Sequence, residues 1–465
     1  MRSRLLKLRQ RGMTACTANL ERYGSKLALD PALLARCHNY GKEDSAMEIA
    51  TDWATSAPLD AINLSRHELF ESEAVLDIFK RLRREDPVHY CADSAFGPFW
   101  SITRYKDIMR VDTDHQAFSS SDEFGGIMID DNVVRPPVEG VNISAFITKD
   151  QPHHAPIRKA VQPIAGPAAM ASYQGLIAER TQQVLDSLPD GEPFDWVERV
   201  SIELTTQMLA TLFDFPFEDR HLLTHWSDIS TAMEGSDHFP GHERRVEILM
   251  ECLEYFSRLR IERSNGAPHL DLISMLARNA HTKDMDPMSF LGNLMLLIVG
   301  GNDTTRNSMS ASIHAWNRFP EEFQTLVDDP GLVDKMVAEV IRWQTPLSHM
   351  RRTAREDAMV GDKLIKKGDK VVIWYYSGNQ DEDMFEDPRT IRFNRANGNR
   401  HLSFGFGIHR CMGLRVAELQ LRILWQKILQ QFESIELIDA PTRLSSNFIN
   451  GYSRMMVKAT RKASP

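Results

Sequence analysis

Residues 404–413 read Phe-Gly-Phe-Gly-Ile-His-Arg-Cys-Met-Gly and bring Cys411 to the start of an expected helix near Leu414. Gly405 and Gly407 allow the backbone to turn tightly and to come close to a flat partner. The N–H groups and partial positive charge at a helix start stabilise a thiolate. A thiolate held in this way suits a soft metal centre. A buried structural cysteine behind a glycine-rich turn is the alternative.

An acid and an alcohol, Asp303 and Thr304, follow two adjacent glycines, Gly300 and Gly301, in an otherwise apolar stretch. Each glycine in a helix interior costs about 1 kcal/mol, so the pair predicts a local widening that admits a small ligand to the backbone. A carboxyl group beside a hydroxyl is suited to proton delivery. The alternative is a helix that ends at the glycines, with Asp303 capping a new one.

Together these segments resemble signature sequences of the cytochrome P450 superfamily. Residues 404–413 match every position of its haem-binding loop, and residues 300–305 are similar to its oxygen-activation segment. The resemblance implies a haem b cofactor with Cys411 as the proximal iron ligand. It implies that Asp303 and Thr304 are the acid and alcohol that deliver protons to dioxygen. The remaining expected haem contacts in the two segments are Phe404, Gly405, Gly301 and Thr305.

Two further motifs extend the resemblance along the chain. Glu339 and Arg342 lie one helical turn apart, which alone predicts only a surface ion pair. They also match the superfamily's Glu-x-x-Arg pair, which implies a structural role in support of the cysteine loop. His154 and Arg158 fit the two helix positions that reach the haem propionates, although the adjacent His153 leaves the assignment of the histidine ambiguous.

The remaining propionate contacts are expected after the Glu-x-x-Arg helix and in the cysteine loop. Either Arg351 or Arg352 fits the first position, and the spacing to Ala354 favours Arg352. His409 fits the second position. A haem brings two carboxylates into a buried site, so several cationic donors are required around them.

The elements that must position these residues are mostly helical. A long helix is expected from Asp286-Pro287, an N-cap followed by proline, to a point before Phe319-Pro320, and it should run through the body of the protein. Residues 366–376 read as a hairpin-like stretch with a turn at 366–369. The expected fold is therefore mainly α with small β-sheets, a single large domain over residues 61–465 that follows an N-terminal extension over residues 1–60. Other expected elements are helices near 71–85, 332–343 and from 414 onward, strands at 88–90 and 99–103, and a long loop over 119–149.

The substrate is less determined than the cofactor. Residues 300–309, 344–352 and 446–452 resemble one bacterial branch of the superfamily, which contains terminal hydroxylases of medium-chain alkanes and fatty acids. An apolar pocket suits such a chain, and the 119–149 loop is expected to help close it. Alternatives are a monooxygenase of a cyclic terpenoid or other bulky apolar substrate, or a non-catalytic haem sensor or carrier. The candidate pocket residues, of which about half are expected to be plain core residues, are Leu297, Val299, Leu347, Met350, Phe448 and Ile449.

Composition sets the remaining expectations. The net charge of −9 excludes a global basic field for nucleic acid, and five scattered cysteines fit a cytoplasmic protein. The basic segment 1–11 reads as a solvated tail, with weak membrane association as the alternative. Electrons are expected from a ferredoxin and a separate NAD(P)H-dependent ferredoxin reductase. The basic residues expected to form the docking patch for the ferredoxin are Lys159, Arg400, Arg410 and Arg415.

Overall fold

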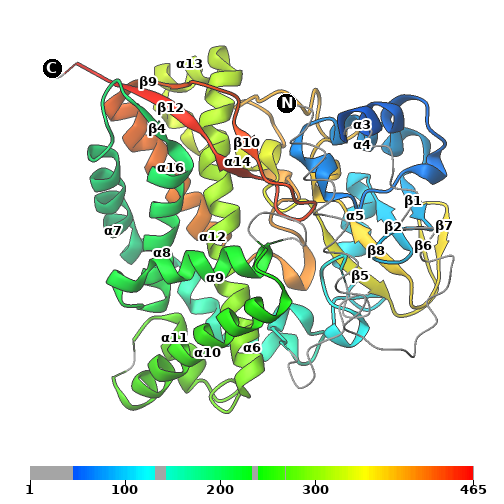
Figure 1. Cartoon of the computed structure of the whole chain (residues 1–465), viewed down its shortest axis with the longest axis horizontal. Helices are drawn as coiled ribbons and strands as arrows, with labels where there is room; N and C mark the ends of the chain where they lie inside the picture. Colours follow the sequence, from blue (N-terminus) through cyan, green and yellow to red (C-terminus); the bar gives the residue numbers. More distant parts are fainter. Residues whose placement is uncertain (1–45, 131–142, 233–238, 268, 464–465) are drawn as a thin grey trace, which may run out of the picture. The chain divides into compact units, whose positions relative to one another are not determined.

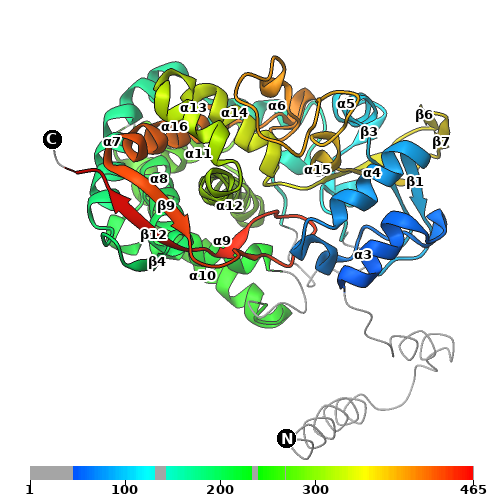
Figure 2. The same cartoon turned by 90° about the horizontal axis from the view of Figure 1, so that it is seen from above.

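The long helix α12 (Pro287–Arg318) has 32 residues and forms the axis of the fold. Asp286 caps it, since its Oδ1 atom accepts hydrogen bonds from the backbone N–H groups of Met288 and Ser289, both at 3.0 Å. Figure 2 shows the helix almost end-on with other elements around it. The predicted start and end of this helix are confirmed, and it continues without a break through the two glycines.

The computed structural model describes residues 46–130, 143–232, 239–267 and 269–463. Helices dominate, as the sequence predicts, and those on one side of α12 include α7, α8, α10, α11 and α16 (Figure 1). The helices besides α12 are α3 (Ala46–Thr55), α4 (Val75–Glu85), α5 (Tyr105–Thr113), α6 (His154–Val161), α7 (Pro167–Asp186), α8 (Glu203–Phe213), α9 (His221–Thr231), α10 (His242–Asn265), α11 (Leu272–Arg278), α13 (Pro320–Asp328), α14 (Val333–Gln344), α15 (Tyr375–Gly378) and α16 (Leu414–Gln431).

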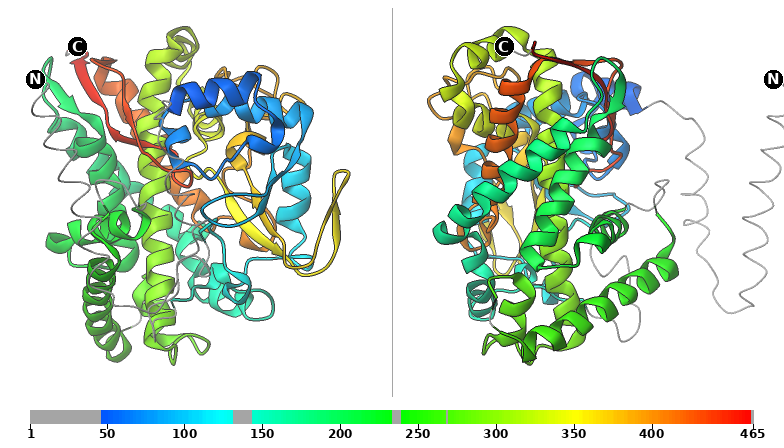
Figure 3. Two further views of the ribbon diagram at one scale, coloured as in Figure 1. Left: turned by 45° about the vertical axis from the view of Figure 1, so that its right-hand side comes forward. Right: turned by 90° about the vertical axis from the view of Figure 1, so that its left-hand side faces the viewer.

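A five-stranded sheet, in the order β1-β2-β8-β5-β3, lies on the other side of α12 (Figures 1 and 3). Its strands are β1 (Val88–Cys91), β2 (Phe99–Ile102), β3 (Phe118–Ser119), β5 (Met350–Ala354) and β8 (Lys370–Ile373). The small sheets combine β4 (Pro193–Asp195), β12 (Met456–Arg461) and β9 (Phe432–Leu437), then β10 (Thr442–Arg443) with β11 (Tyr452–Arg454), and β6 (Ala358–Val360) with β7 (Lys363–Ile365).

The hairpin predicted over residues 366–376 is wrong in its pairing. The turn after β7 is present, but β7 pairs with β6, whereas β8 pairs with β5 and, in parallel, with β2. Tyr375 and Tyr376 are not in a strand but open the short helix α15. The four residues of β8 are all buried, so this strand belongs in the centre of the larger sheet, which local sequence signals do not reveal.

One compact unit begins at Ala46. Helix α3 packs on α4, with Ala50 buried and the backbone carbonyl of Trp53 accepting a hydrogen bond from Arg81 Nη1 at 2.8 Å. The rest of the expected N-terminal extension, including the basic segment 1–11, lies outside the described residues. Among the described helices, none is both long and apolar enough to cross a bilayer.

Candidate active site

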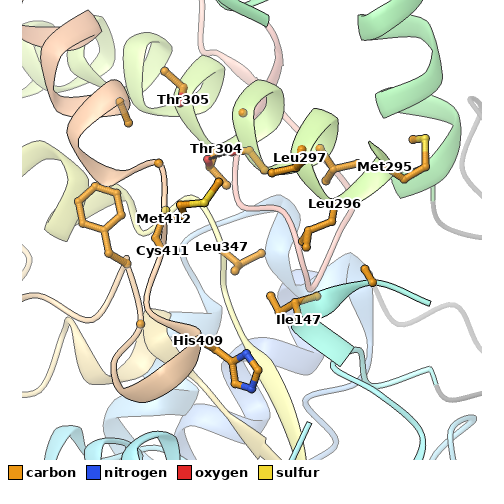
Figure 4. A pocket seen from close by; sticks show the side chains of 18 of the residues that line it. Ile147, Met295, Leu296, Leu297, Thr304, Thr305, Leu347, His409, Cys411 and Met412 are labelled. Atoms are coloured by element: carbon orange, nitrogen blue, oxygen red, sulfur yellow. Dashed lines mark hydrogen bonds between the residues drawn. The ribbon is translucent and has the colours of Figure 1, made fainter. Parts of the chain in front are cut away.

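A cavity of about 440 Å³ lies between α12 and the loop that carries Cys411. In Figure 4, Thr304 and Cys411 lie toward the same end of this space, and Met295 lies farther along α12. The helix contributes residues about one turn apart, among them Gly292, Leu296 and Gly300, because positions three or four apart share a helix face. The opposite wall comes from segments distant in sequence, including the start of β5 and residues 448–449.

The cysteine loop is tightly folded around its glycines. Gly405 and Gly407 have φ values of +60° and +67°, which glycine adopts without strain. A Cβ atom at Gly407 would lie 2.6 Å from the backbone oxygen of Asp112, so only glycine allows this approach to α5. The Cys411 N–H donates to the Phe404 carbonyl at 2.7 Å. Burial raises the pKa of the Cys411 thiol, whereas N–H groups of Gly413 and Leu414 and the Arg158 guanidinium favour the thiolate.

Asp112, which the sequence did not single out, ties this loop to the cationic wall of the cavity. Its Oδ1 atom accepts from Arg352 Nη2 at 2.7 Å. Its Oδ2 atom accepts from the Tyr375 hydroxyl at 2.9 Å and from the Phe406 N–H at 2.8 Å. The side chain is almost fully buried. Because all three partners are distant in sequence, nothing in the local pattern around α5 identifies this residue.

The cavity is lined by three of the side chains predicted to bind the propionates of the cofactor. They are Arg158, Arg352 and His409. Side chains alternate along a strand, so Met350 and Arg352 face the cavity. Arg351 points to the other side of β5, where its guanidinium donates to the backbone oxygens of Gly125 and Phe124. The geometry therefore favours Arg352 over Arg351.

His154 does not line the cavity but packs directly behind it. Its ring lies 4.5 Å from that of His409, centroid to centroid. Burial, together with the Arg158 guanidinium, lowers the pKa of His154 to about 4. Burial and the neighbouring Arg352 lower the pKa of His409 to about 2. His409 Nε2 contacts the Ser120 hydroxyl at 2.7 Å, while His409 Nδ1 and both ring nitrogens of His154 are buried without a hydrogen-bond partner.

These observations fit a haem. The cavity has a cysteine at one wall, and two arginines and a histidine beside it. The buried Nδ1 atom of that histidine, His409, lacks a hydrogen-bond partner, which an acid group of the cofactor would supply. Cys411 would ligate the iron, and Arg158, Arg352 and His409 would hold the propionates. The other residues predicted beside the cofactor, which also line the cavity, are Phe404, Gly405, Gly301 and Thr305.

The acid and the alcohol on α12 have different positions. Thr304 lines the cavity, and its hydroxyl donates to the Gly300 carbonyl at 3.0 Å. Asp303 is absent from the described cavity wall and is almost fully buried beside Arg306, whose Nη2 atom lies 2.8 Å from Asp303 Oδ1. Burial raises the pKa of Asp303, against the effect of Arg306. Arg306, which the sequence reasoning missed, also contacts Asp228 on α9 at 3.0 Å.

Glu339 and Arg342 form a buried ion pair rather than a surface pair. Arg342 Nε and Nη2 donate to the two carboxylate oxygens of Glu339, each at 2.8 Å. Arg395, unnoticed in the sequence, adds a third bond at 2.9 Å. Arg342 Nη1 donates to the backbone oxygens of Asn379 and Pro388. The pair thus fastens α14 to the segment that precedes the cysteine loop, and it does not line the cavity.

The apolar wall contains all the predicted pocket residues. They are Leu297, Val299, Leu347, Met350, Phe448 and Ile449, of which Phe448 and Ile449 are also buried core residues. Segments at both ends of the predicted 119–149 loop also contribute, through Ile127 and Met128 at one end and through 145–148 at the other. The part of this loop over 131–142 lies outside the described residues.

Comparisons with known proteins agree with this geometry. The family model for cytochrome P450 matches residues 95–450. The chain is 34% identical to linalool 8-monooxygenase of Pseudomonas putida over 85% of this chain and 98% of that protein. It is 28% identical to a methyl-branched lipid omega-hydroxylase of Mycobacterium bovis over 82% and 90% of the two chains.

Among solved structures, CYP153D17 from Sphingomonas sp. PAMC 26605 superposes with a TM-score of 0.81 at 42% identity. The match covers 87% of this chain and 100% of that one. Haem b is the cofactor of the matched family, which confirms the cofactor inferred from the cysteine loop. The chain belongs to the cytochrome P450 family and is a haem-dependent monooxygenase.

Proposed function

We propose that this monooxygenase hydroxylates the terminal carbon of a medium-chain alkane or fatty acid. The observation that carries the proposal is the course of the cavity along α12. From Thr304, near Cys411, its wall continues along α12 as far as Gly292, which is roughly 18 Å at the helical rise of 1.5 Å per residue. Between these points the wall is mainly aliphatic, with Leu296, Leu297 and Val299 on the helix. An elongated apolar cavity suits an unbranched hydrocarbon chain.

The position of oxidation depends on how the chain is held. A terminal C–H bond is stronger than the internal ones, so the pocket must fix the chain end beside the reacting centre. Leu347 and Ile449 pair in a β-bridge, which joins the two segments of this wall. The similarity to a protein named as an omega-hydroxylase also supports terminal attack.

The residue roles in this proposal follow from their positions. Bound haem supplies the activation of dioxygen. Cys411 holds the iron, and Arg158, Arg352 and His409 bind the propionates, with His154 packed behind them. Thr304 holds a proton at its hydroxyl on the cavity wall, and Asp303 supplies protons to that wall from the protein interior. Glu339 and Arg342 are structural.

Cytochrome P450 chemistry needs electrons from redox partners, and we propose a ferredoxin served by a separate NAD(P)H-dependent reductase. Lys159, Arg400, Arg410 and Arg415 are all exposed. Arg400 and Arg410 share a second hollow of about 330 Å³, and Phe404 and Gly405 line both this hollow and the cavity. A basic surface so close to the cysteine loop favours an acidic electron donor.

A spectral titration of the purified ferric protein tests the substrate proposal. Octane, dodecanoic acid and a bulky cyclic terpene are added in parallel, and the spin state of the iron is followed. We expect the linear compounds to shift the spin state and the terpene to be silent. A response to the terpene alone would overturn the terminal-hydroxylase proposal and would favour a bulky substrate, while leaving the family assignment intact.

A further inference from the structure

Asp303 is the expected proton source, yet it is not one of the described residues that line the cavity. Thr231, the last residue of α9, does line the cavity. The Thr231 hydroxyl lies 3.3 Å from Asp303 Oδ2. A hydroxyl that touches the carboxyl and also faces the cavity provides the connection that the carboxyl itself lacks.

The two oxygens of Asp303 have different surroundings. Oδ1 faces the protein interior, where Arg306 Nη2 contacts it at 2.8 Å and Asn302 Nδ2 donates to it at 3.2 Å. Oδ2 faces α9 and the Thr231 hydroxyl. Arg306 in turn reaches Asp228, whose side chain is 45% exposed, so the network extends from solvent to the buried carboxyl. Within the part of the chain that the structure describes, the charged groups around Asp303 are Arg306 on its own helix and Asp228 on α9.

From this geometry we infer that Thr231 is a second hydroxyl in proton delivery and connects Asp303 to the cavity. The inference rests on the proposed role of Asp303 as the proton source. When Asp303 is protonated, its O–H donates to the Thr231 oxygen, 3.3 Å away. The Thr231 hydroxyl proton then turns from its backbone acceptor, the Ser227 carbonyl at 3.1 Å, toward the cavity. As the Thr231 proton passes to an acceptor in the cavity, the Asp303 proton moves to the Thr231 oxygen. Thr231 remains neutral, Asp303 becomes a carboxylate, and it takes up a proton from solvent before the next delivery.

Ser230 provides a matched control in the same helical turn. It also lines the cavity, and its hydroxyl donates to the Ser227 carbonyl at 2.8 Å, as the Thr231 hydroxyl does at 3.1 Å. Thr231→Val keeps the shape of the side chain and removes the hydroxyl. Ser230→Ala removes a hydroxyl whose hydrogen bond goes to the Ser227 carbonyl rather than to Asp303. A purely structural effect of losing a hydroxyl at the end of α9 would affect both variants alike.

The experiment measures the ratio of product formed to NADH consumed in the reconstituted holoenzyme over a range of pH. The variants are Thr231→Val, Ser230→Ala, Asp303→Asn and the double variant Asp303→Asn/Thr231→Val. We expect this ratio to fall at least about tenfold in Thr231→Val, with electron use maintained, and to stay within twofold in Ser230→Ala. The double variant should be no worse than Asp303→Asn, because residues in one network are not additive.

A second readout does not depend on turnover. The infrared C=O band of the protonated carboxyl, identified as the band that Asp303→Asn removes, should shift in Thr231→Val and not in Ser230→Ala. If Asp303→Asn lowers the ratio but Thr231→Val behaves like Ser230→Ala in both measurements, the role of Thr231 is overturned and that of Asp303 stands. If Asp303→Asn itself leaves the ratio unchanged, the proposed role of Asp303 is overturned, and the role of Thr231 with it.

Discussion

At the scale of single residues, the site separates groups that face the cavity from groups that hold them in place. Thr304 and Arg352 line the cavity, whereas Asp303 and Asp112 are buried behind them. Asp112 fixes Arg352, Tyr375 and the cysteine loop at once. Such buried carboxylates are tolerated because hydrogen bonds and cations compensate for the loss of water.

Thr304→Ala should separate electron use from product formation. The variant loses the hydroxyl on the cavity wall, so product per NADH should fall by about 10²-fold, the lower end of the effect of a positioned proton donor. NADH oxidation should continue, because the substitution leaves the cysteine loop untouched. Thr304→Ser retains the hydroxyl and should keep most of the coupling. An unchanged ratio in Thr304→Ala would count against the role of the hydroxyl.

At the scale of elements, the buried Glu339–Arg342 ion pair of α14 supports the cysteine loop. Burial opposes ionisation of Glu339, but Arg342 and Arg395 hold its pKa below the ordinary value of 4.5. A carboxyl with a lowered pKa stabilises the fold above its ordinary pKa and loses that contribution as the pH falls through the lowered value. The pair therefore stabilises the protein fully at neutral pH.

Glu339→Gln should destabilise the protein by about 3–5 kcal/mol at pH 7, because it leaves the Arg342 charge buried without its carboxylate. Denaturant unfolding measures this difference, and Glu433→Gln on the exposed side of β9 serves as the control. The difference between wild type and Glu339→Gln should be constant above pH 4.5 and should shrink at lower pH. A difference that does not depend on pH down to acid unfolding would contradict the ionised pair.

The approach of the cysteine loop to α5 provides another test. Gly407→Ala places a methyl group 2.6 Å from the Asp112 carbonyl at a φ of +67°, which should destabilise the loop by about 1–3 kcal/mol and lower the haem content of the purified protein. Gly175→Ala in α7, where a Cβ atom meets nothing within 4 Å, should retain full haem content. Equal haem content in the two variants would show that the loop does not need this close approach.

The sequence predicts the bounds of helices better than it predicts contacts between segments that are distant in the chain. The bounds of α12 and α14 were predictable, because capping residues, prolines and apolar periodicity act locally. The six residues predicted for the pocket and Arg352 also line the cavity. The pairing of β8 was not, and neither were Asp112, Arg395 or the Thr231–Asp303 contact. Each of these depends on segments that meet only after folding, so no local pattern carries the information.

At the scale of the whole molecule, the net charge of −9 contrasts with the basic surface near the cysteine loop. Glutamate substitutions at Arg400 and Arg415 should slow reduction by ferredoxin about tenfold at low ionic strength, since complementary charge mainly accelerates association. The loss should diminish at high salt. Lys367→Glu, in the exposed turn between β7 and β8, should have little effect. Equal slowing by Lys367→Glu would place the docking surface elsewhere.

The most direct test of the account is the position of the hydroxyl group in the product. Octane is supplied to the holoenzyme with a ferredoxin, its reductase and NADH, and the alcohols are separated by gas chromatography. A cavity that holds the chain along α12, with one end beside Thr304 and Cys411, predicts 1-octanol as the main product. A mixture dominated by internal alcohols would contradict the central claim, since it would mean that the pocket does not fix the chain end.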